Sequence, residues 1–288
     1  MKLINSIKDI DTYDYFIFDI WGVIHDGINA YPTAQESIKY LNSIGKKICF
    51  LSNAPRRNFI VEEVLEKFSI NKDLYQFVMT SGESLHNYMK KNQQQNYNKY
   101  NKNYYYIGPD KDIDLLSDLN YNINNNISKC DFALATGFPE DPGDINQVMP
   151  ILEECKKNNL TILCANPDLK VVRQDGSEMN CAGLIGKTYE DMGCKVEYFG
   201  KPYSYVYKIT CNLLNNVEKN NVIAIGDGID TDIKGANINN IDSLLLTGGL
   251  LSNDLNIKYW QNPDMTILKN ICHTNKVMPN YVISNLKL

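Results

Sequence analysis

Short apolar runs alternate with amphipathic stretches along most of the chain. Runs of this kind suit strands that are buried on both faces of a parallel sheet, and the stretches between them have the periodicity of helices with one apolar face. The predicted strands are 15–20, 47–51, 77–80, 104–107, 132–136, 161–165, 222–225 and 243–246. The predicted helices are 33–44, 58–68, 144–158, 182–192 and 204–214.

This alternation predicts an α/β fold, a Rossmann-like parallel sheet flanked by helices. In such sheets, ligands bind beyond the carboxyl ends of the strands. Asp19 lies at the end of the first predicted strand, Ser52 and Asn53 follow the second, and Asp227 follows the strand 222–225. Lys201, in Gly-Lys-Pro, precedes the last predicted helix. The sequence therefore predicts that chemically useful side chains gather at one edge of a sheet.

The stretch 81–197 separates the first two of these positions from the last two and contains strands and helices of its own. We interpret it as an inserted α/β domain that covers the site and selects the substrate. Residues 1–80 and 198–288 then form the catalytic core, although they are far apart in the sequence.

Composition narrows the function classes. With 288 residues, 43% of them apolar and 22% charged, the chain reads as an ordinary globular protein. The first fifteen residues mix acids and bases, and later apolar runs are short, so neither a secretory signal nor a membrane span is expected. The eight cysteines form no C-x-x-C pair and are expected to be reduced thiols, which predicts a cytoplasmic location.

A net charge of −5 disfavours general attraction to nucleic acid. Two segments, 89–106 and 120–129, are nevertheless rich in Asn, Lys and Tyr. Such a composition could stack on single-stranded nucleic acid, but we favour solvated loops, and nucleic acid is not an expected partner.

The residues at the strand ends make a coherent set for phosphoryl transfer. A carboxylate such as Asp19 can attack phosphorus, while a divalent cation and Lys201 offset the charge of the transferred group. Magnesium suits Asp19 and Asp227 because it prefers hard oxygen ligands. The chain has no G-x-x-x-x-G-K-[ST], and Gly226-Asp227-Gly228 does not continue as G-x-G-x-x-G, which disfavours a nucleoside triphosphatase and a dehydrogenase.

Four motifs in this order resemble the haloacid dehalogenase-like hydrolase superfamily, specifically its class IIA members, which carry a large cap between the second and third motifs. The motifs are FDIWGVIHDG at 18–27, FLSNAPR at 50–56, FGKP at 199–202 and IGDGIDTDIKGA at 225–236. Within the insertion, CANPD at 164–168 and CAGLIG at 181–186 are also similar to that family. There, Asn166 and Asp168 could face the leaving group or simply close a turn.

The resemblance implies a role for each matching residue. Asp19 would be the nucleophile and a magnesium ligand, and Asp227 would bind the same ion with support from Asp232. Ser52 would bind the phosphoryl group together with Asn53 and Lys201. A small phosphomonoester would be the substrate, and Mg²⁺ the cofactor. The oligomeric state stays open, and a homo-oligomer is compatible with the sequence.

Trp21 departs from this pattern. Phosphatases of the family usually carry a second aspartate there, which protonates the leaving group and then activates water. An indole N–H cannot transfer protons at physiological pH. Metal binding need not be lost, because in the family this position contributes its backbone carbonyl, which Trp21 also has.

Three explanations follow. His25, whose reference pKa is near neutrality, could supply the proton, with Asp26 a weaker substitute, although a packed turn histidine is the more usual role. The enzyme could act slowly on activated substrates whose leaving groups need no acid, or it could transfer the phosphoryl group rather than hydrolyse the ester. Alternatively, the protein could be a catalytically impaired phospholigand-binding or regulatory protein of the same fold.

Overall fold

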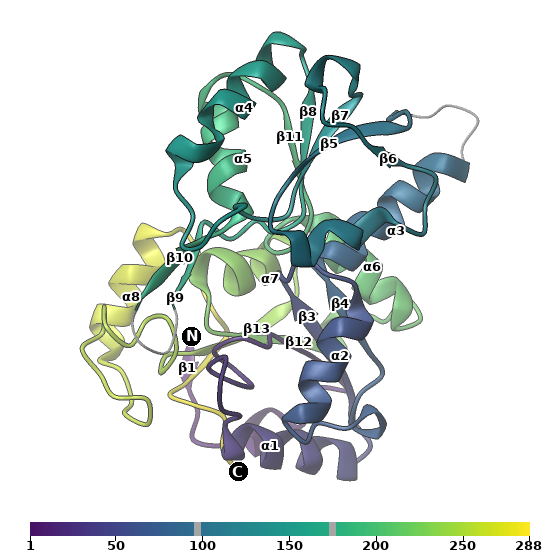
Figure 1. Ribbon diagram of the computed structural model, residues 1–288. Coiled ribbons are helices and arrows are strands. Elements are labelled where there is room, and N and C mark those ends of the chain that lie inside the picture. The colour runs from purple at the N-terminus through teal and green to yellow at the C-terminus, as the bar shows by residue number, and fades with distance from the viewer. Residues whose placement is uncertain (95–98, 173–176) are drawn as a thin grey trace. The chain divides into compact units, whose positions relative to one another are not determined.

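The computed structural model describes residues 1–94, 99–172 and 177–288, with the side chain of Val172 left out of the description. Two compact units make up the chain (Figure 1). The first unit comprises 1–52, 61–79 and 207–288. The second unit comprises 53–60 and 80–206, so it contains the whole of the expected insertion 81–197, residues 80 and 198–206 on either side of it, and the separate stretch 53–60.

The first unit is built on a seven-stranded sheet with the order β1-β14-β13-β12-β2-β3-β4. The pairs from β1 to β3 in this order are all parallel. The strands are β1 (Lys2–Leu3), β2 (Tyr15–Phe18), β3 (Lys47–Ser52), β4 (Phe77–Thr80), β12 (Val222–Gly226), β13 (Asp242–Leu246) and β14 (Tyr281–Ile283).

The order of this sheet reverses at β2. From β2 the chain proceeds outward through β3 and β4, whereas β12, β13 and β14 extend the sheet on the other side. Phe18 pairs with Ile225 of β12 and with Phe50 of β3. A reversal of strand order is where open parallel sheets place their ligands, because the loops on either side diverge there.

The first unit contains all or part of five helices. Two of them, α2 and α6, begin in the second unit and continue into the first. Under α8, an apolar cluster including Leu268, Cys272, Leu245 and Val282 joins the helix to β13 and β14. The helices are α1 (Pro32–Ser43), α2 (Asn58–Lys67), α6 (Ser204–Leu213), α7 (Lys234–Ile238) and α8 (Met265–Thr274).

The second unit has its own parallel five-stranded sheet, in the order β11-β8-β7-β5-β6. A short antiparallel pair, β9 (Lys170–Val172) with β10 (Glu178–Asn180), lies outside it. The sheet strands are β5 (Asn103–Ile107), β6 (Asn122–Ile123), β7 (Phe132–Ala135), β8 (Thr161–Cys164) and β11 (Val196–Tyr198), and the helices are α3 (Ser81–Gln94), α4 (Ile145–Lys157) and α5 (Ala182–Asp191).

The side chains of the second unit's strands alternate between the two faces of its sheet, so the unit has three layers, the sheet in the middle and helices on each face. Ala133 and Ala135 of β7 point into the apolar cluster formed with α4 and α5. Phe132 and Leu134 of the same strand point into the cluster formed with α3. Since successive side chains of a strand face opposite sides, one sheet buries helices on both faces (Figure 1).

The predicted α/β fold is confirmed, and every predicted strand and helix is present with its ends shifted by at most two residues. The pattern missed α3, α7, α8, β1, β6, β9, β10, β11 and β14. All six of these strands are only two or three residues long, too short for a periodic signal. The missed helix α3 is polar in composition, yet it buries Ser81, Ser84 and His86 as well as Leu85.

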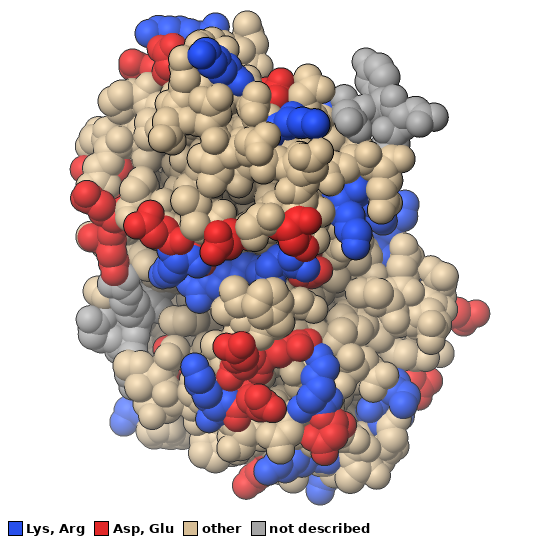
Figure 2. Space-filling model, turned by 45° about the vertical axis from the view of Figure 1, so that its right-hand side comes forward, with Lys and Arg blue, Asp and Glu red and all other residues tan. Residues whose placement is uncertain are grey.

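The Asn/Lys/Tyr-rich segments, predicted as solvated loops, in fact supply core residues. Tyr100, Tyr104 and Tyr121 are buried and pack against Phe132, so these rings do not form an exposed stacking surface. Tyr97 lies outside the described residues. On the face drawn in Figure 2, acidic side chains border the basic ones, which weakens the attraction that a nucleic-acid backbone would meet there.

A helix that crosses a bilayer needs about 20 mostly apolar residues, and the helices among the described residues fall short of this.

Candidate functional site

Asp19 follows β2 directly and is fixed by the neighbouring strand. Its backbone N–H donates a hydrogen bond of 2.8 Å to the carbonyl oxygen of Ile225, the residue before Gly226 and Asp227. The carboxyl ends of β2 and β12 therefore deliver two aspartates to the same point of the sheet.

Three carboxylates meet there. One oxygen from each of Asp19, Asp227 and Asp232 lies within 4.8 Å of the others. Asp227 and Asp232 are buried, while Asp19 is partly exposed. Anions placed so closely repel one another at low dielectric, and a divalent cation that prefers oxygen ligands relieves that repulsion. The donor set thus fits the Mg²⁺ expected from the sequence.

Glycines allow the backbone to approach these carboxylates. A Cβ on Gly22, whose φ is +80°, or on Gly249 would collide with the carboxylate of Asp227. A Cβ on Gly226 would likewise collide with Asp232. The glycines of the first and fourth motifs therefore permit the compact packing around the acidic group.

Backbone N–H groups orient two of the acids. Gly228 donates to Asp232 Oδ2 at 3.1 Å, and Leu250 donates to Asp227 Oδ2 at 3.0 Å. Asp232 lies in a π-helical turn, Ile229–Ile233, which precedes α7. The contribution of Gly249 and Leu250, in the loop after β13, was not predicted, although Thr-Gly-Gly after a predicted strand was a usable signal.

Ser52 is the last residue of β3 and lies two positions beyond Phe50, which pairs with Phe18. Its hydroxyl therefore belongs to the edge of the sheet from which Asp19 emerges.

Asn53 and Lys201 are buried residues of the second unit and bind each other. The Lys201 N–H donates to Asn53 Oδ1 at 2.7 Å, and Asn53 Nδ2 donates to the Lys201 carbonyl at 3.1 Å. Asn53 Nδ2 also donates to Asp168 Oδ1 at 2.8 Å. The Asn53 amide is thus engaged with the chain around Lys201, a role that sequence reasoning did not foresee.

Trp21 lies against the turn that follows it. Its ring makes an edge contact with His25 at a centroid distance of 5.5 Å, and a Cβ on Gly27 would strike the indole. The side chain is nevertheless 40% exposed. The tryptophan therefore presents an indole surface two residues after the candidate nucleophile.

His25 is buried between Trp21 and Phe68, whose ring centroid lies 4.6 Å away. Its Nδ1 accepts a hydrogen bond of 2.9 Å from the Gly27 N–H. Burial lowers the pKa of His25 to about 4, and the nearby Asp26 offsets this only in part. The near-neutral pKa that made His25 a candidate proton donor is therefore absent from this environment.

Asp26, the weaker candidate proton donor, is held in its ionised form. Burial raises its pKa, but hydrogen bonds from Asn29 and Ile28 outweigh that effect, and the net pKa is lowered. Both N–H groups donate to Asp26 Oδ1, at 2.7 and 2.9 Å. The side chain closes a turn, as short acidic residues commonly do.

Comparison with protein-family models identifies the framework of this site. A haloacid dehalogenase-like hydrolase model matches residues 16–122, and a HAD-hydrolase-like model matches residues 198–274. The first match contains the motifs around Asp19 and Ser52, and the second contains those around Lys201 and Asp227. The chain belongs to the haloacid dehalogenase-like hydrolase superfamily. The models leave 123–197, most of the predicted insertion, unmatched.

Two named phosphatases are similar in sequence to this haloacid dehalogenase-like protein. The sugar-phosphatase AraL of Bacillus subtilis is 25% identical over 240 residues, which cover 81% of this chain and 82% of that protein. A 4-nitrophenylphosphatase of Schizosaccharomyces pombe is 39% identical, but over only 56 residues, 18% of this chain and 19% of that protein.

Solved structures share the fold of this haloacid dehalogenase-like chain. A haloacid dehalogenase-like hydrolase from Brucella suis has a TM-score of 0.82 at 23% identity, covering 99% of this chain and 100% of the other. A p-nitrophenyl phosphatase from Archaeoglobus fulgidus has a TM-score of 0.72 at 20% identity, covering 95% and 96%.

Proposed function

We propose that this protein is a magnesium-dependent phosphatase that hydrolyses a small phosphomonoester through an aspartyl phosphate on Asp19. The observation that carries the proposal is the convergence of Asp19, Asp227 and Asp232 at the reversal point of the sheet. The phosphatase names of AraL and of the 4-nitrophenylphosphatase support the reaction class.

Mg²⁺ would be held by Asp19, Asp227 and the backbone carbonyl of Trp21, with Asp232 supporting the site. The carboxylates offer the hard, anionic oxygen atoms that this ion prefers. When bound, the ion supplies positive charge that offsets the negative charge of the phosphoryl group and the nucleophile.

In the first step, a carboxylate oxygen of Asp19 attacks phosphorus, and the bond from phosphorus to the leaving oxygen breaks. Ser52 would donate to the phosphoryl oxygens, the Lys201 ammonium would offset their charge, and the backbone N–H of Asn53 would donate to the same oxygens. In the second step, water attacks the aspartyl phosphate, which releases inorganic phosphate and restores Asp19. We further propose that residues 81–197 form the cap that selects the substrate.

Proton transfer is the weak part of this site. Trp21 cannot protonate the leaving oxygen, His25 is buried with Nδ1 occupied by Gly27, and Asp26 is tied into a turn. General acid and base catalysis contributes about 10² to 10⁴ in rate, so turnover would persist for leaving groups that depart as stable anions. We therefore propose that activated phosphate esters are the better substrates.

The same residues support a second candidate function, a phospholigand-binding or regulatory protein. Replacement of the proton donor by Trp21 favours it, because binding of phosphate and metal does not require an acid. Turnover separates the two functions.

The test measures phosphate release from a panel of sugar, aryl and other metabolite phosphates, with Mg²⁺ and after its removal by EDTA. We expect magnesium-dependent release that Asp19→Asn abolishes without loss of folding, because a carboxamide cannot form the acyl phosphate in the same way. Undiminished release by the variant would exclude Asp19 as the nucleophile. Magnesium-dependent binding of phosphate esters without release would establish the second function instead.

A further inference from the structure

The side chain of Asn53 joins three parts of the second unit that are far apart in sequence. Its amide accepts from the Lys201 N–H and donates to the Lys201 carbonyl and to the Asp168 carboxylate. An amide has two N–H donors and an oxygen that can accept two hydrogen bonds, so Lys201 and Asp168 engage the donor nitrogen twice and the oxygen once, in a residue that is only 6% exposed.

We propose that Asp168 is a positioning residue for Lys201 and acts through Asn53. The proposal rests on the proposed phosphatase function, in which the Lys201 ammonium offsets the charge of the phosphoryl group. Asp168 holds the Asn53 amide with a charge-assisted hydrogen bond, and Asn53 in turn fixes the backbone on both sides of the Lys201 Cα.

Asp168 is itself anchored by its backbone. Its N–H donates to Asn166 Oδ1 at 3.0 Å, and its carbonyl accepts from the Gly183 N–H at 3.0 Å. A Cβ on Gly183 would collide with the carbonyls of Pro167 and Asp168, so the start of α5 packs directly on this turn. The carboxylate therefore projects from a backbone that is held at two points.

Gly200, the residue before Lys201, packs closely against the same Asn53 amide. Gly200 has a φ of +119°, and a Cβ there would collide with Asn53 Oδ1 and with the hydroxyl of Ser81. The Ser81 hydroxyl donates to the carbonyl of Phe199. Residues 199–201 are thus held on one side by α3 and on the other by Asn53.

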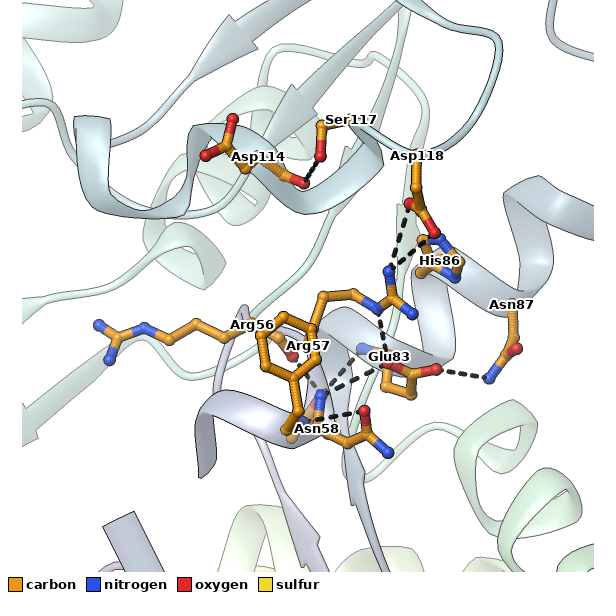
Figure 3. Close-up of polar contacts among 11 residues, drawn as sticks. Arg56, Arg57, Asn58, Glu83, His86, Asn87, Asp114, Ser117 and Asp118 are labelled. Atoms are coloured by element: carbon orange, nitrogen blue, oxygen red, sulfur yellow. Dashed lines mark hydrogen bonds and ion pairs between the residues drawn. The ribbon is translucent and has the colours of Figure 1, made fainter. Parts of the chain in front are cut away.

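The segment 53–60 has a second attachment, which provides a control. Figure 3 shows Arg57 directed toward Glu83 and Asp118, with the Arg57 Nε to Glu83 distance at 2.7 Å and Arg57 Nη1 to Asp118 at 3.2 Å. His86 Nε2 lies 2.8 Å from Asp118 Oδ1. Asp118 therefore holds the same segment as Asp168 does, but through Arg57 rather than through Asn53.

The first experiment compares Asp168→Ala with Asp118→Ala in the full chain. We expect Asp168→Ala to lower kcat for 4-nitrophenyl phosphate by about 10- to 100-fold. A displacement of a catalytic group by about 1 Å can lower the rate by this much. The affinity for Mg²⁺ should not change, because the metal carboxylates lie in the other unit. Asp118→Ala should lose stability but keep its kcat.

Conservative and exchanged variants separate positioning from folding. Asp168→Asn should keep most of the activity, because its amide oxygen still accepts from Asn53. Asn53→Asp should lose the most, because two carboxylates then face each other. The double variant Asn53→Asp with Asp168→Asn should regain part of that loss, since the donor and the acceptor have changed places. Absence of any recovery in a folded double variant would overturn the proposal.

Hydrogen exchange at the Lys201 amide provides a readout that does not depend on turnover. Its N–H should exchange faster in Asp168→Ala than in the parent, and at the parental rate in Asp118→Ala. Reduced kcat with unchanged exchange would mean that Asp168 does not act through Lys201, and would overturn the proposal. If the parent protein releases no phosphate from any ester, the proposed function is refuted. The exchange rates would still show whether Asp168 fixes the Lys201 backbone through Asn53.

Discussion

At the scale of single residues, Trp21 decides what chemistry the site can perform. In the proposed function, its backbone carbonyl would be one of the magnesium ligands. Its side chain packs against His25 and Gly27 and provides no titratable group. The framework for phosphoryl transfer is therefore separated from the proton transfer that usually accompanies it.

Trp21→Asp should raise hydrolysis of an alkyl phosphate more than hydrolysis of 4-nitrophenyl phosphate. The alkoxide needs a proton as it departs, whereas nitrophenolate does not. Steady-state rates for both esters, at saturating Mg²⁺, measure the difference. Because Trp21 is 40% exposed, the substitution should lower the free energy of unfolding by less than the loss of about 3–5 kcal/mol that follows truncation of a fully buried aromatic side chain.

His25→Ala is the companion variant. If a folded Trp21→Asp shows no gain on either ester while His25→Ala abolishes the parental activity, His25 is the proton donor despite its burial.

Asp227→Asn should weaken Mg²⁺ binding by at least about tenfold, because one of the two proposed carboxylate ligands becomes neutral. The asparagine oxygen can still accept from the Leu250 N–H, so local structure should survive. Isothermal titration calorimetry measures the affinity. Asp230→Asn, which neutralises an exposed acid in the adjacent turn Ile229–Ile233, is the control, and equal affinity in both variants would remove Asp227 from the site.

At the scale of elements, the fourth motif acts through the helix that follows it. Gly235 of α7 packs on Tyr207 of α6, and a Cβ there would collide with the phenol. Tyr207 donates from its hydroxyl to the carbonyl of Asp232 at 3.3 Å. A glycine in a helix thus lets α6 approach the turn that carries one of the site's acids.

Gly235→Ala should destabilise the fold by about 1–3 kcal/mol, because the buried ring of Tyr207 has no room to move. Denaturant unfolding of the parent and the variant gives the difference. Adding Tyr207→Phe removes the nearest colliding atom, and the double variant should recover part of the loss. A Gly235→Ala protein as stable as the parent would show that α6 and α7 are not closely packed.

At the scale of the whole molecule, all eight cysteines are free thiols, distributed over both units. Cys49, Cys155, Cys164, Cys181 and Cys272 are buried, and the other three are partly buried. Burial raises the pKa of Cys155, Cys164 and Cys181 to about 12. Thiols with such pKa values are inert at neutral pH.

We therefore expect slow labelling of the native protein by Ellman's reagent, and eight reactive thiols after unfolding without reductant. The two thiol counts test the expectation directly. Fewer than eight in the unfolded protein would reveal a disulfide.

The sequence by itself determined the α/β fold and the order of the four motifs, because buried parallel strands need apolar runs and place chemistry where the runs end. Asp19 and Asp227 could be predicted as neighbours for that reason. The same pattern did not reveal that the Asn/Lys/Tyr-rich segments contribute Tyr100 and Tyr104 to a core, since their composition resembles that of a loop.

Only the tertiary structure decided which partners each side chain meets. Leu250 reaches Asp227 from a loop 23 residues further along the chain, and Asp168 reaches Asn53 across 115 residues. It also decided that the pKa of His25 falls to about 4, because desolvation depends on the burial that packing against Trp21 and Phe68 creates. Local pattern specifies where a strand ends, whereas contacts between distant segments set the hydrogen bonds and the solvation of the groups found there.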